Sequence, residues 1–271
     1  LEVLQRLGHA PPALCHDPRL PPAPRCRLCS VEIEGQHDPV NSCALPVSEG
    51  LVVRSDSPAL QAYRHQWLEA LGAHCRTEDL ERHPQKALHQ ALRAQGIAPS
   101  GQGSRVDDSH PLIHVDLARC ISCQRCVRVC HELQGQDVWH QLGRGEGVQL
   151  VPDSGGSLGA SHCVACGACV DACPTAALVD AGGLQHERAE RWTRSVCSYC
   201  GVGCELELGT VDEQVVGVRP VLAAPVNKGH LCVKGRYGQG FAQSSRRVLT
   251  PMLRREGGWE ACSWDEALDE V

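Results

Sequence analysis

One cysteine spacing that occurs twice decides the fold. Residues 120–130 read CISCQRCVRVC and residues 163–174 read CVACGACVDACP. The two runs share their spacing, with thiols at Cys120, Cys123, Cys126 and Cys130 and at Cys163, Cys166, Cys169 and Cys173. Such an internal repeat indicates a doubled unit. A 4Fe-4S cubane needs four thiolates, so the repeat predicts two cubanes within residues 111–183.

The second run ends in Cys173-Pro174 and resembles the bacterial ferredoxin motif. In that arrangement the fourth cysteine of each run binds the other cluster. The resemblance therefore implies one cubane on Cys120, Cys123, Cys126 and Cys173, and another on Cys130, Cys163, Cys166 and Cys169. Small residues between the ligands, Ala165, Gly167 and Ala168, leave room for backbone N–H groups beside the sulfurs. Structural zinc is the alternative, but it usually takes two separated CxxC pairs.

The first 56 residues carry four more cysteines, at Cys15, Cys26, Cys29 and Cys43. This spacing resembles the N-terminal 2Fe-2S domain of the largest peripheral subunit of complex I and of related hydrogenases and formate dehydrogenases. The resemblance implies a β-grasp fold whose opening hairpin lies upstream of Leu1. Apolar runs predict short strands at 31–33 and 51–53.

Two helices are expected between residues 57 and 96. Ser57 is a good N-cap and Pro58 a good first helical residue. A second helix is expected after Thr77, with a bend at Pro84 and an end at Gly96. In the family that the first module resembles, this segment carries a His and three cysteines for another 4Fe-4S cluster.

Here that cluster is expected to be absent, because only His74 and Cys75 remain of its ligands. The histidines of the segment are then expected to be solvated or packing residues: His65, His74, His83 and His89. Cys75 and Cys262 have no partner pattern and are expected to be packing thiols.

The last cysteine group is Cys197, Cys200, Cys204 and Cys232, embedded in CSYCGVGC and LCVKGR. It resembles the N-terminal 4Fe-4S domain of molybdenum or tungsten bis-pterin oxidoreductases, formate dehydrogenases above all. The resemblance implies that Lys234 relays electrons between the cubane and a pterin; the alternative is a solvated surface charge. Alternating residues predict strands at 204–208 and 215–218 around a turn.

These motifs predict an α+β chain of several modules. Its parts are a 2Fe-2S ferredoxin-type domain (1–56), a helical segment (57–96), a linker (97–110), a double 4Fe-4S ferredoxin-type domain (111–183), a linker (184–193), a β-rich 4Fe-4S domain of the bis-pterin type (194–250) and the start of a catalytic domain (251–271). Residues 135–161 lack a sustained period and are expected to form a surface loop.

Composition fits backbone wrapped around clusters, with 27 Gly and 17 Pro but one Phe and one Met in 271 residues. The net charge of -6 comes from mixed signs without a basic run, which counts against nucleic acid and anionic membranes as partners. A secreted disulfide framework is an alternative for 18 cysteines, but it has no reason to repeat CxxCxxCxxxC. Both ends are interpreted as cut, since Leu1 already looks helical.

The resemblances together imply the N-terminal iron-sulfur portion of a formate dehydrogenase catalytic subunit. Its metal-bound bis-pterin guanine dinucleotide site would lie beyond Val271, so the 271-residue chain is expected to carry electrons but not to oxidise formate. The implied acceptor is a flavin- and NAD-binding partner subunit or a ferredoxin, and a cytoplasmic location is expected. Alternatives are an electron-input subunit of a complex I-like or hydrogenase assembly, or another bis-pterin enzyme such as nitrate reductase. The doubled cysteine run counts against the complex I form, and CSYCGVGC against the hydrogenase form.

Overall fold

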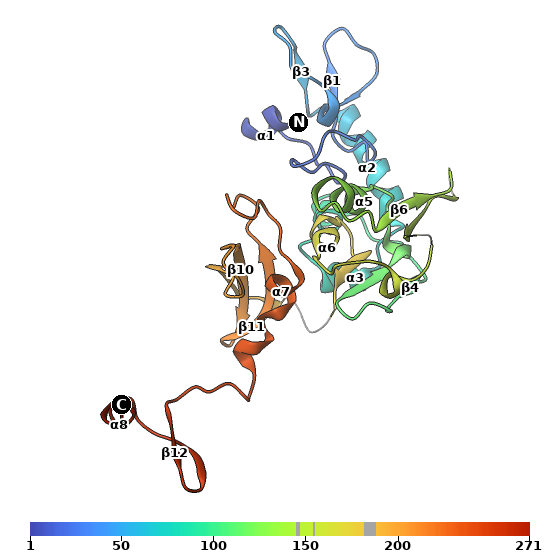
Figure 1. The fold of residues 1–271 in the computed structure, drawn as a ribbon. Coiled ribbons are helices and arrows are strands. Elements are labelled where there is room, and N and C mark those ends of the chain that lie inside the picture. Colours follow the sequence, from blue (N-terminus) through green and yellow to red (C-terminus); the bar gives the residue numbers. More distant parts are fainter. Residues whose placement is uncertain (145–146, 154, 182–187) are drawn as a thin grey trace.

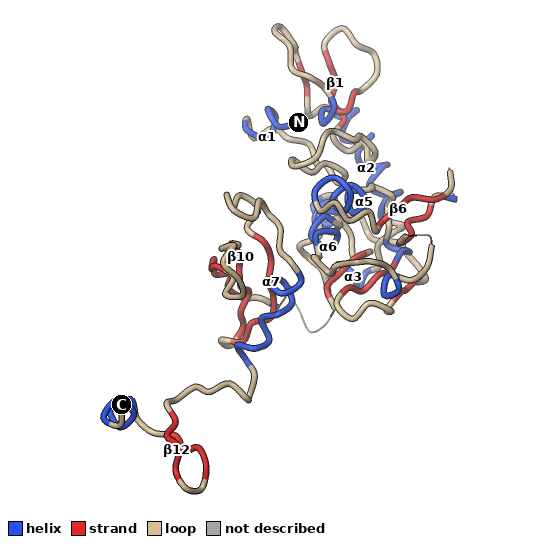
Figure 2. Tube along the Cα trace, viewed as in Figure 1, coloured by secondary structure: helices blue, strands red, loops and turns tan. Residues whose placement is uncertain are grey.

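A computed structural model describes residues 1–144, 147–153, 155–181 and 188–271. Figure 1 shows a mixed α/β chain in which the N-terminal strands stand at one end of a central body. A second β-rich unit lies beside that body, and the C-terminal hairpin and helix extend away from both (Figures 1 and 2). The predicted α+β arrangement of small modules agrees with this picture.

The first module is loop-rich, as expected from its sequence. Its sheet has the order β2-β1-β3 with antiparallel neighbours. The elements are α1 (Glu2–Arg6), β1 (Ser30–Ile33), β2 (Val40–Asn41) and β3 (Val53–Arg54). Buried Arg64 from the next helix donates to the carbonyls of Leu28 and Ser30, and so fixes the sheet to the helical segment.

The helical segment begins where the sequence predicts. Helix α2 (Pro58–Gly72) starts after Ser57, whose side chain accepts from the Leu60 N–H. The second expected helix is two helices, α3 (Thr77–Arg82) and α4 (Ala87–Ala94), because Pro84 lies between them. Gly96 follows α4 with a φ of 64°, the left-handed conformation of a helix stop.

The central body combines a three-stranded sheet, β4-β5-β8, with two short helices that carry the repeated cysteines. Its main elements are β4 (Val106–Asp107), β5 (Ile113–Asp116), α5 (Arg125–Arg128), α6 (Ala168–Ala172) and β8 (Leu178–Asp180). The expectation of a bare surface loop over 135–161 is wrong. The segment forms a hairpin of β6 (Trp139–Leu142) and β7 (Gln149–Pro152), and Trp139 is buried in the core of the body.

The last module is a sheet of order β11-β10-β9, made of β9 (Arg191–Val196), β10 (Glu205–Val211) and β11 (Gln214–Pro220). Asp212 and Glu213 both have positive φ, 47° and 63°, which fits the two-residue turn of a tight hairpin. The linker was expected to extend to residue 193, but β9 already begins at Arg191 and pairs with β10. Residues 182–187, which include the start of that expected linker, lie outside the described part.

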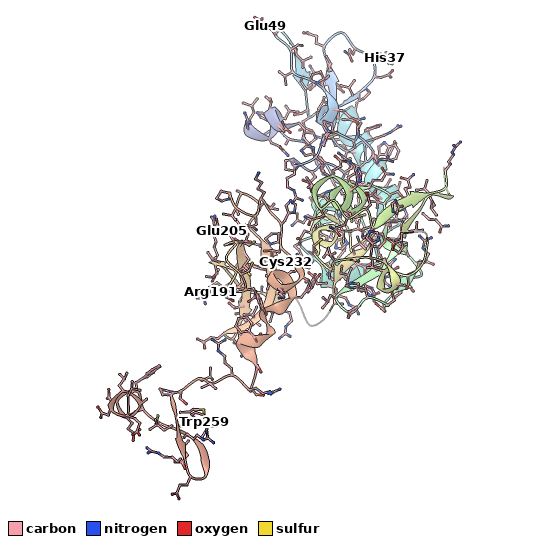
Figure 3. The ribbon with its side chains drawn as sticks, in the orientation of Figure 1. His37, Glu49, Arg191, Glu205, Cys232 and Trp259 are labelled. Atoms are coloured by element: carbon pink, nitrogen blue, oxygen red, sulfur yellow. The ribbon has the colours of Figure 1, made fainter. Side chains whose placement is uncertain are left out.

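The chain continues through α7 (Val233–Tyr237) to β12 (Met252–Arg255), β13 (Gly258–Ala261) and α8 (Trp264–Asp269). Trp259 marks the far hairpin in Figure 3, well away from Cys232. Ser263 caps α8 by accepting a hydrogen bond from the Glu266 N–H.

Candidate iron-sulfur centres

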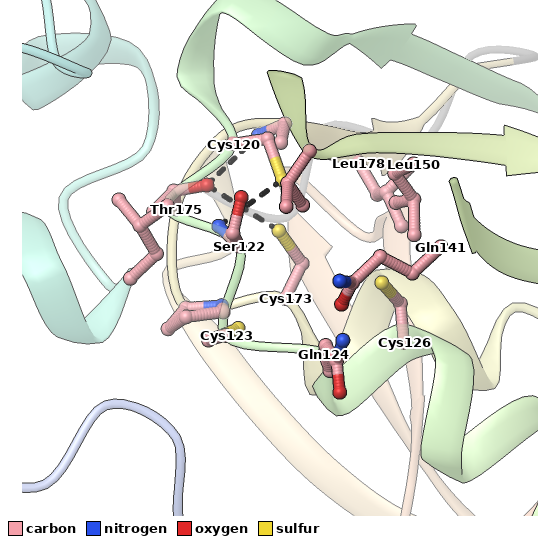
Figure 4. A pocket seen from close by; sticks show the side chains of 14 residues that line it. Cys120, Ser122, Cys123, Gln124, Cys126, Gln141, Leu150, Cys173, Thr175 and Leu178 are labelled. Atoms are coloured by element: carbon pink, nitrogen blue, oxygen red, sulfur yellow. Dashed lines mark hydrogen bonds between the residues drawn. The ribbon is translucent and has the colours of Figure 1, made fainter. Parts of the chain in front are cut away.

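The first cavity of the central body is lined by four thiols: Cys120, Cys123, Cys126 and Cys173. Figure 4 shows their sulfur atoms around a common space, with Leu150 and Leu178 among the apolar side chains beside them. Cys120 and Cys123 come from the loop before α5, Cys126 lies on α5 itself, and Cys173 directly follows α6. This is the set that the ferredoxin resemblance assigns to one cubane, which we call centre A.

The second cavity is lined by Cys130, Cys163, Cys166 and Cys169. Cys130 follows α5, whereas the other three belong to the loop before α6 and to α6 itself. Trp139 and Val138 from the unexpected hairpin region close the apolar wall. This is the second implied set, and we call it centre B.

The loop after the first thiol has the same backbone conformation in both halves of the repeat. Ser122 and Ala165, each two residues after the first thiol, have φ of 52° and 53°. Their N–H groups lie 3.4 Å from the sulfurs of Cys120 and Cys163. Amides that donate to cluster sulfurs stabilise the negative charge there and raise the reduction potential.

The first module holds its four thiols as two pairs. The sulfurs of Cys15 and Cys26 lie 3.5 Å apart, and the hydrogen bond between them lowers the pKa of Cys15 to about 5 against the effect of burial. A hydrogen bond with Cys43 likewise lowers the pKa of Cys29 to about 6. A 2Fe-2S cluster takes four cysteine ligands for two irons, so two pairs of thiols fit one pair per iron.

The last four thiols lie at the surface of the C-terminal module. Cys197 and Cys204 are held together by a 2.8 Å backbone hydrogen bond, and Cys232 precedes α7 (Figure 3). Burial raises the pKa of Cys204, and the nearby thiolates of the other three cysteines raise it further. We call this set, Cys197, Cys200, Cys204 and Cys232, centre C.

The donor chemistry at all four places fits iron-sulfur clusters. Each place offers four cysteine sulfurs, and those of centres A and B line apolar cavities. In the described part of the chain, no group of three or more His, Cys, Asp or Glu side chains converges on a point where one metal ion would bind. The thiols of A and B surround a space instead.

The region around His74 and Cys75 has a different character. Cys75 is fully buried in an apolar cluster with Leu68 and Leu88, and burial raises its pKa to about 11. His74 Nδ1 lies 3.4 Å from the carbonyl oxygen of Ala118. Neither side chain lines the cavities of centres A and B.

Replacing Cys75 with alanine is expected to leave the iron content unchanged and to lower the free energy of unfolding by about 1 kcal/mol, typical of one small core change. Iron analysis and thermal unfolding of the anaerobically purified protein would measure both. A loss of about four irons would contradict the prediction and make Cys75 a ligand.

Charged residues next to the ligands join the modules, and the cysteine spacings gave no sign of them. Arg125, directly before Cys126, donates to the carbonyl of Leu14, directly before Cys15, at 3.4 Å. The Lys86 ammonium donates to the carbonyls of Val170 and Cys173 at 3.1 and 3.2 Å. These bonds tie the helical segment to the end of α6, where the ligand Cys173 of centre A lies. Their partners lie more than 80 residues away in sequence, so no local pattern could reveal them.

Family models match three parts of the chain. Residues 1–58 match a 2Fe-2S iron-sulfur cluster binding domain, and residues 110–179 match the ferredoxin-like domain of NADH-quinone oxidoreductase subunit 3. Residues 190–244 match the molybdopterin oxidoreductase Fe4S4 domain. The four centres therefore lie inside matched iron-sulfur domains.

Whole-chain relatives combine the same parts. An NADH-quinone oxidoreductase subunit of Rhizobium meliloti is 33% identical over 99% of this chain and 32% of its own length. A Bacillus subtilis protein, named provisionally as a formate dehydrogenase, is 28% identical over 100% of this chain and 33% of its own. The solved NAD+-reducing [NiFe]-hydrogenase is similar with a TM-score of 0.57 and 31% identity, over 66% of this chain and 79% of that one.

The chain thus belongs to a family of multi-cluster iron-sulfur proteins that serve as electron-transfer parts of oxidoreductases. Within that family it is the N-terminal iron-sulfur portion shared by NADH-quinone oxidoreductase subunits of this type and formate dehydrogenase-like proteins. It spans about a third of the length of these curated relatives. Among the described residues, no helix is long and apolar enough to cross a membrane.

Proposed function

We propose that the chain is a four-centre electron relay in which one 2Fe-2S cluster and centres A, B and C are arranged in that order. Iron-sulfur clusters accept and release single electrons, while the protein sets their spacing and surroundings. The proposed ligands are the sixteen cysteines described above; Cys75 and Cys262 are not ligands.

The observation that carries this proposal is the sharing of apolar cores by the 2Fe-2S site, centre A and centre B. Cys15 and Cys26 of the first module lie in one cluster of buried side chains with Cys123 of centre A. Cys126 and Cys173 of centre A share a second such cluster with Cys130 and Cys169 of centre B. Buried neighbours exclude water from the space between centres, which suits electron transfer because it limits solvent reorganisation.

The relay predicts about 14 iron atoms per chain, with matching acid-labile sulfide and little zinc, after anaerobic purification. Metal and sulfide analysis would measure this directly. About 18 irons would mean that a further cubane forms near Cys75, whereas a mainly zinc-containing, colourless protein would overturn the relay.

For the full-length protein we propose formate oxidation at a molybdenum or tungsten bis-pterin site, with electrons leaving through the 2Fe-2S end to a flavin- and NAD-binding subunit or a ferredoxin. The match of residues 190–244 and the provisionally named relatives support it. Exposed Lys234 on α7, two residues after Cys232, is the proposed relay toward the pterin.

The relatives support equally an electron-input role in a complex I-like or hydrogenase assembly. The doubled cysteine run and the CSYCGVGC motif therefore do not decide between that role and formate oxidation. Formate-dependent dye reduction by the full-length protein would support the formate proposal. Activity with formate from residues 1–271 alone would contradict the expected inactivity of this portion.

A further inference from the structure

Arg236 reaches from the last module into the central body. It lies on α7, four residues after the ligand Cys232, whose carbonyl accepts its N–H at 3.0 Å. Its side chain is only 1% exposed although it leaves its own module. A charge buried this deeply is costly unless it is fully paired.

The pairing comes entirely from the body that holds centres A and B. Arg236 Nε and Nη2 donate to the two carboxylate oxygens of Asp180 at 3.0 and 2.8 Å. Nη1 donates to Asp171 Oδ2 at 2.7 Å. Tyr237 from the same helix donates to Asp180 as well, at 2.6 Å. The planar guanidinium thus makes a two-point contact with Asp180 while it also binds Asp171, and a lysine could not reproduce the two-point contact.

The aliphatic part of the side chain packs on the ligand loop of centre B. Gly167 lies between Cys166 and Cys169 with a φ of 72°, and a Cβ there would come within 2.3 Å of Arg236 Cδ and Nε. On the other side, a Cβ at Gly235 would lie 3.6 Å from the sulfur of Cys197 in centre C. One turn of helix therefore touches the ligand loops of both centres.

We propose that Arg236 is a positioning residue that clamps centre C against centre B and sets the electron-transfer contact between them. The electron-transfer role of Arg236 rests on the proposed relay. Its contacts with Asp171 and Asp180 do not depend on that proposal. The positive charge also offsets Asp171, which lies between two ligands of the clusters, Cys169 and Cys173.

Replacing Arg236 with glutamine removes the guanidinium that joins α7 to Asp171 and Asp180, and so releases α7. In the anaerobically purified protein with about 14 irons we expect three changes. Amide exchange of α7 accelerates, the spin-spin broadening between reduced centres B and C is lost from the EPR spectrum, and the midpoint potential of centre B becomes more negative. Arg236→Lys keeps the positive charge. Its midpoint potential at centre B should therefore lie close to that of the unsubstituted protein, whereas the spin-spin broadening should still be lost.

Arg194→Gln is the matched control, because Arg194 forms an exposed ion pair with Glu205 inside the same module and should change none of the three. Gly167→Ala provides a second test that keeps Arg236 but displaces it. Unchanged α7 exchange and unchanged broadening in both Arg236→Gln and Gly167→Ala would overturn the clamp. Iron content near 14 tests the relay separately from the clamp, because Arg236 is not a proposed ligand.

Discussion

Replacing Cys173 with alanine is expected to remove centre A, even though Cys173 follows Cys169 of centre B by only four residues. The reason is geometric: Cys173 lines the cavity of Cys120, Cys123 and Cys126, not that of Cys169. Iron content should fall from about 14 to about 10 per chain. Loss of a cubane also removes its contribution to folding, so this is the largest effect that we expect from one residue.

Paired substitutions identify which centre is lost. Cys120→Ala together with Cys173→Ala should still give about 10 irons, because both residues belong to centre A. Cys163→Ala together with Cys173→Ala should give about 6, because two centres lose a ligand. The opposite pattern would mean that each run of four cysteines binds its own cluster, and the crossover would be wrong.

Replacing Arg119 with methionine is expected to destabilise the joint between the helical segment and the central body by about 3–5 kcal/mol. Arg119 is 1% exposed and lies 2.8 Å from Asp79 and 3.6 Å from Asp116, both almost fully buried. Removing the cation leaves buried carboxylates short of a partner. Thermal unfolding should therefore shift down by at least about 6 °C.

Arg54→Met provides the control, since Arg54 is 73% exposed and 4.0 Å from Glu32; surface pairs of this kind contribute at most about 1 kcal/mol. The pH dependence gives a second measure. Burial raises the pKa of Asp79, but hydrogen bonds from Arg76 and the charge of Arg119 outweigh it and hold the pKa below its usual value. That stabilisation is present above about pH 4 and is lost as the pH falls further, and Arg119→Met should weaken this loss. Equal thermal midpoints for the two variants would contradict the role of Arg119.

The sequence predicted the parts of the fold that depend on local chemistry. Ser57 and Pro58 start α2 as expected, and Pro84 and Gly96 interrupt and end the helices that follow. The resemblance to the bacterial ferredoxin motif also implied the two sets of four thiols that line the two cavities of the body.

Features made by distant partners were not predictable in this way. The β6–β7 hairpin lacks clear alternation, and its support comes from burial of Trp139 against the cluster loops. Arg236 stands in the same short motif as Lys234, yet its partners Asp171 and Asp180 lie 65 and 56 residues away. The Arg119 pairs with Asp79 likewise depend on tertiary packing alone.

The shared apolar cores have a consequence for how such chains can be recombined. Leu14 of the first module, Leu88 of α4 and Cys123 of the body belong to one cluster of buried side chains, although three sequence modules supply them. A cut between the first module and the helical segment, or between the helical segment and the central body, would open that cluster to water. These modules are therefore poor interchangeable parts: transplanting one of them into another enzyme would require its neighbours' contact surfaces to travel with it.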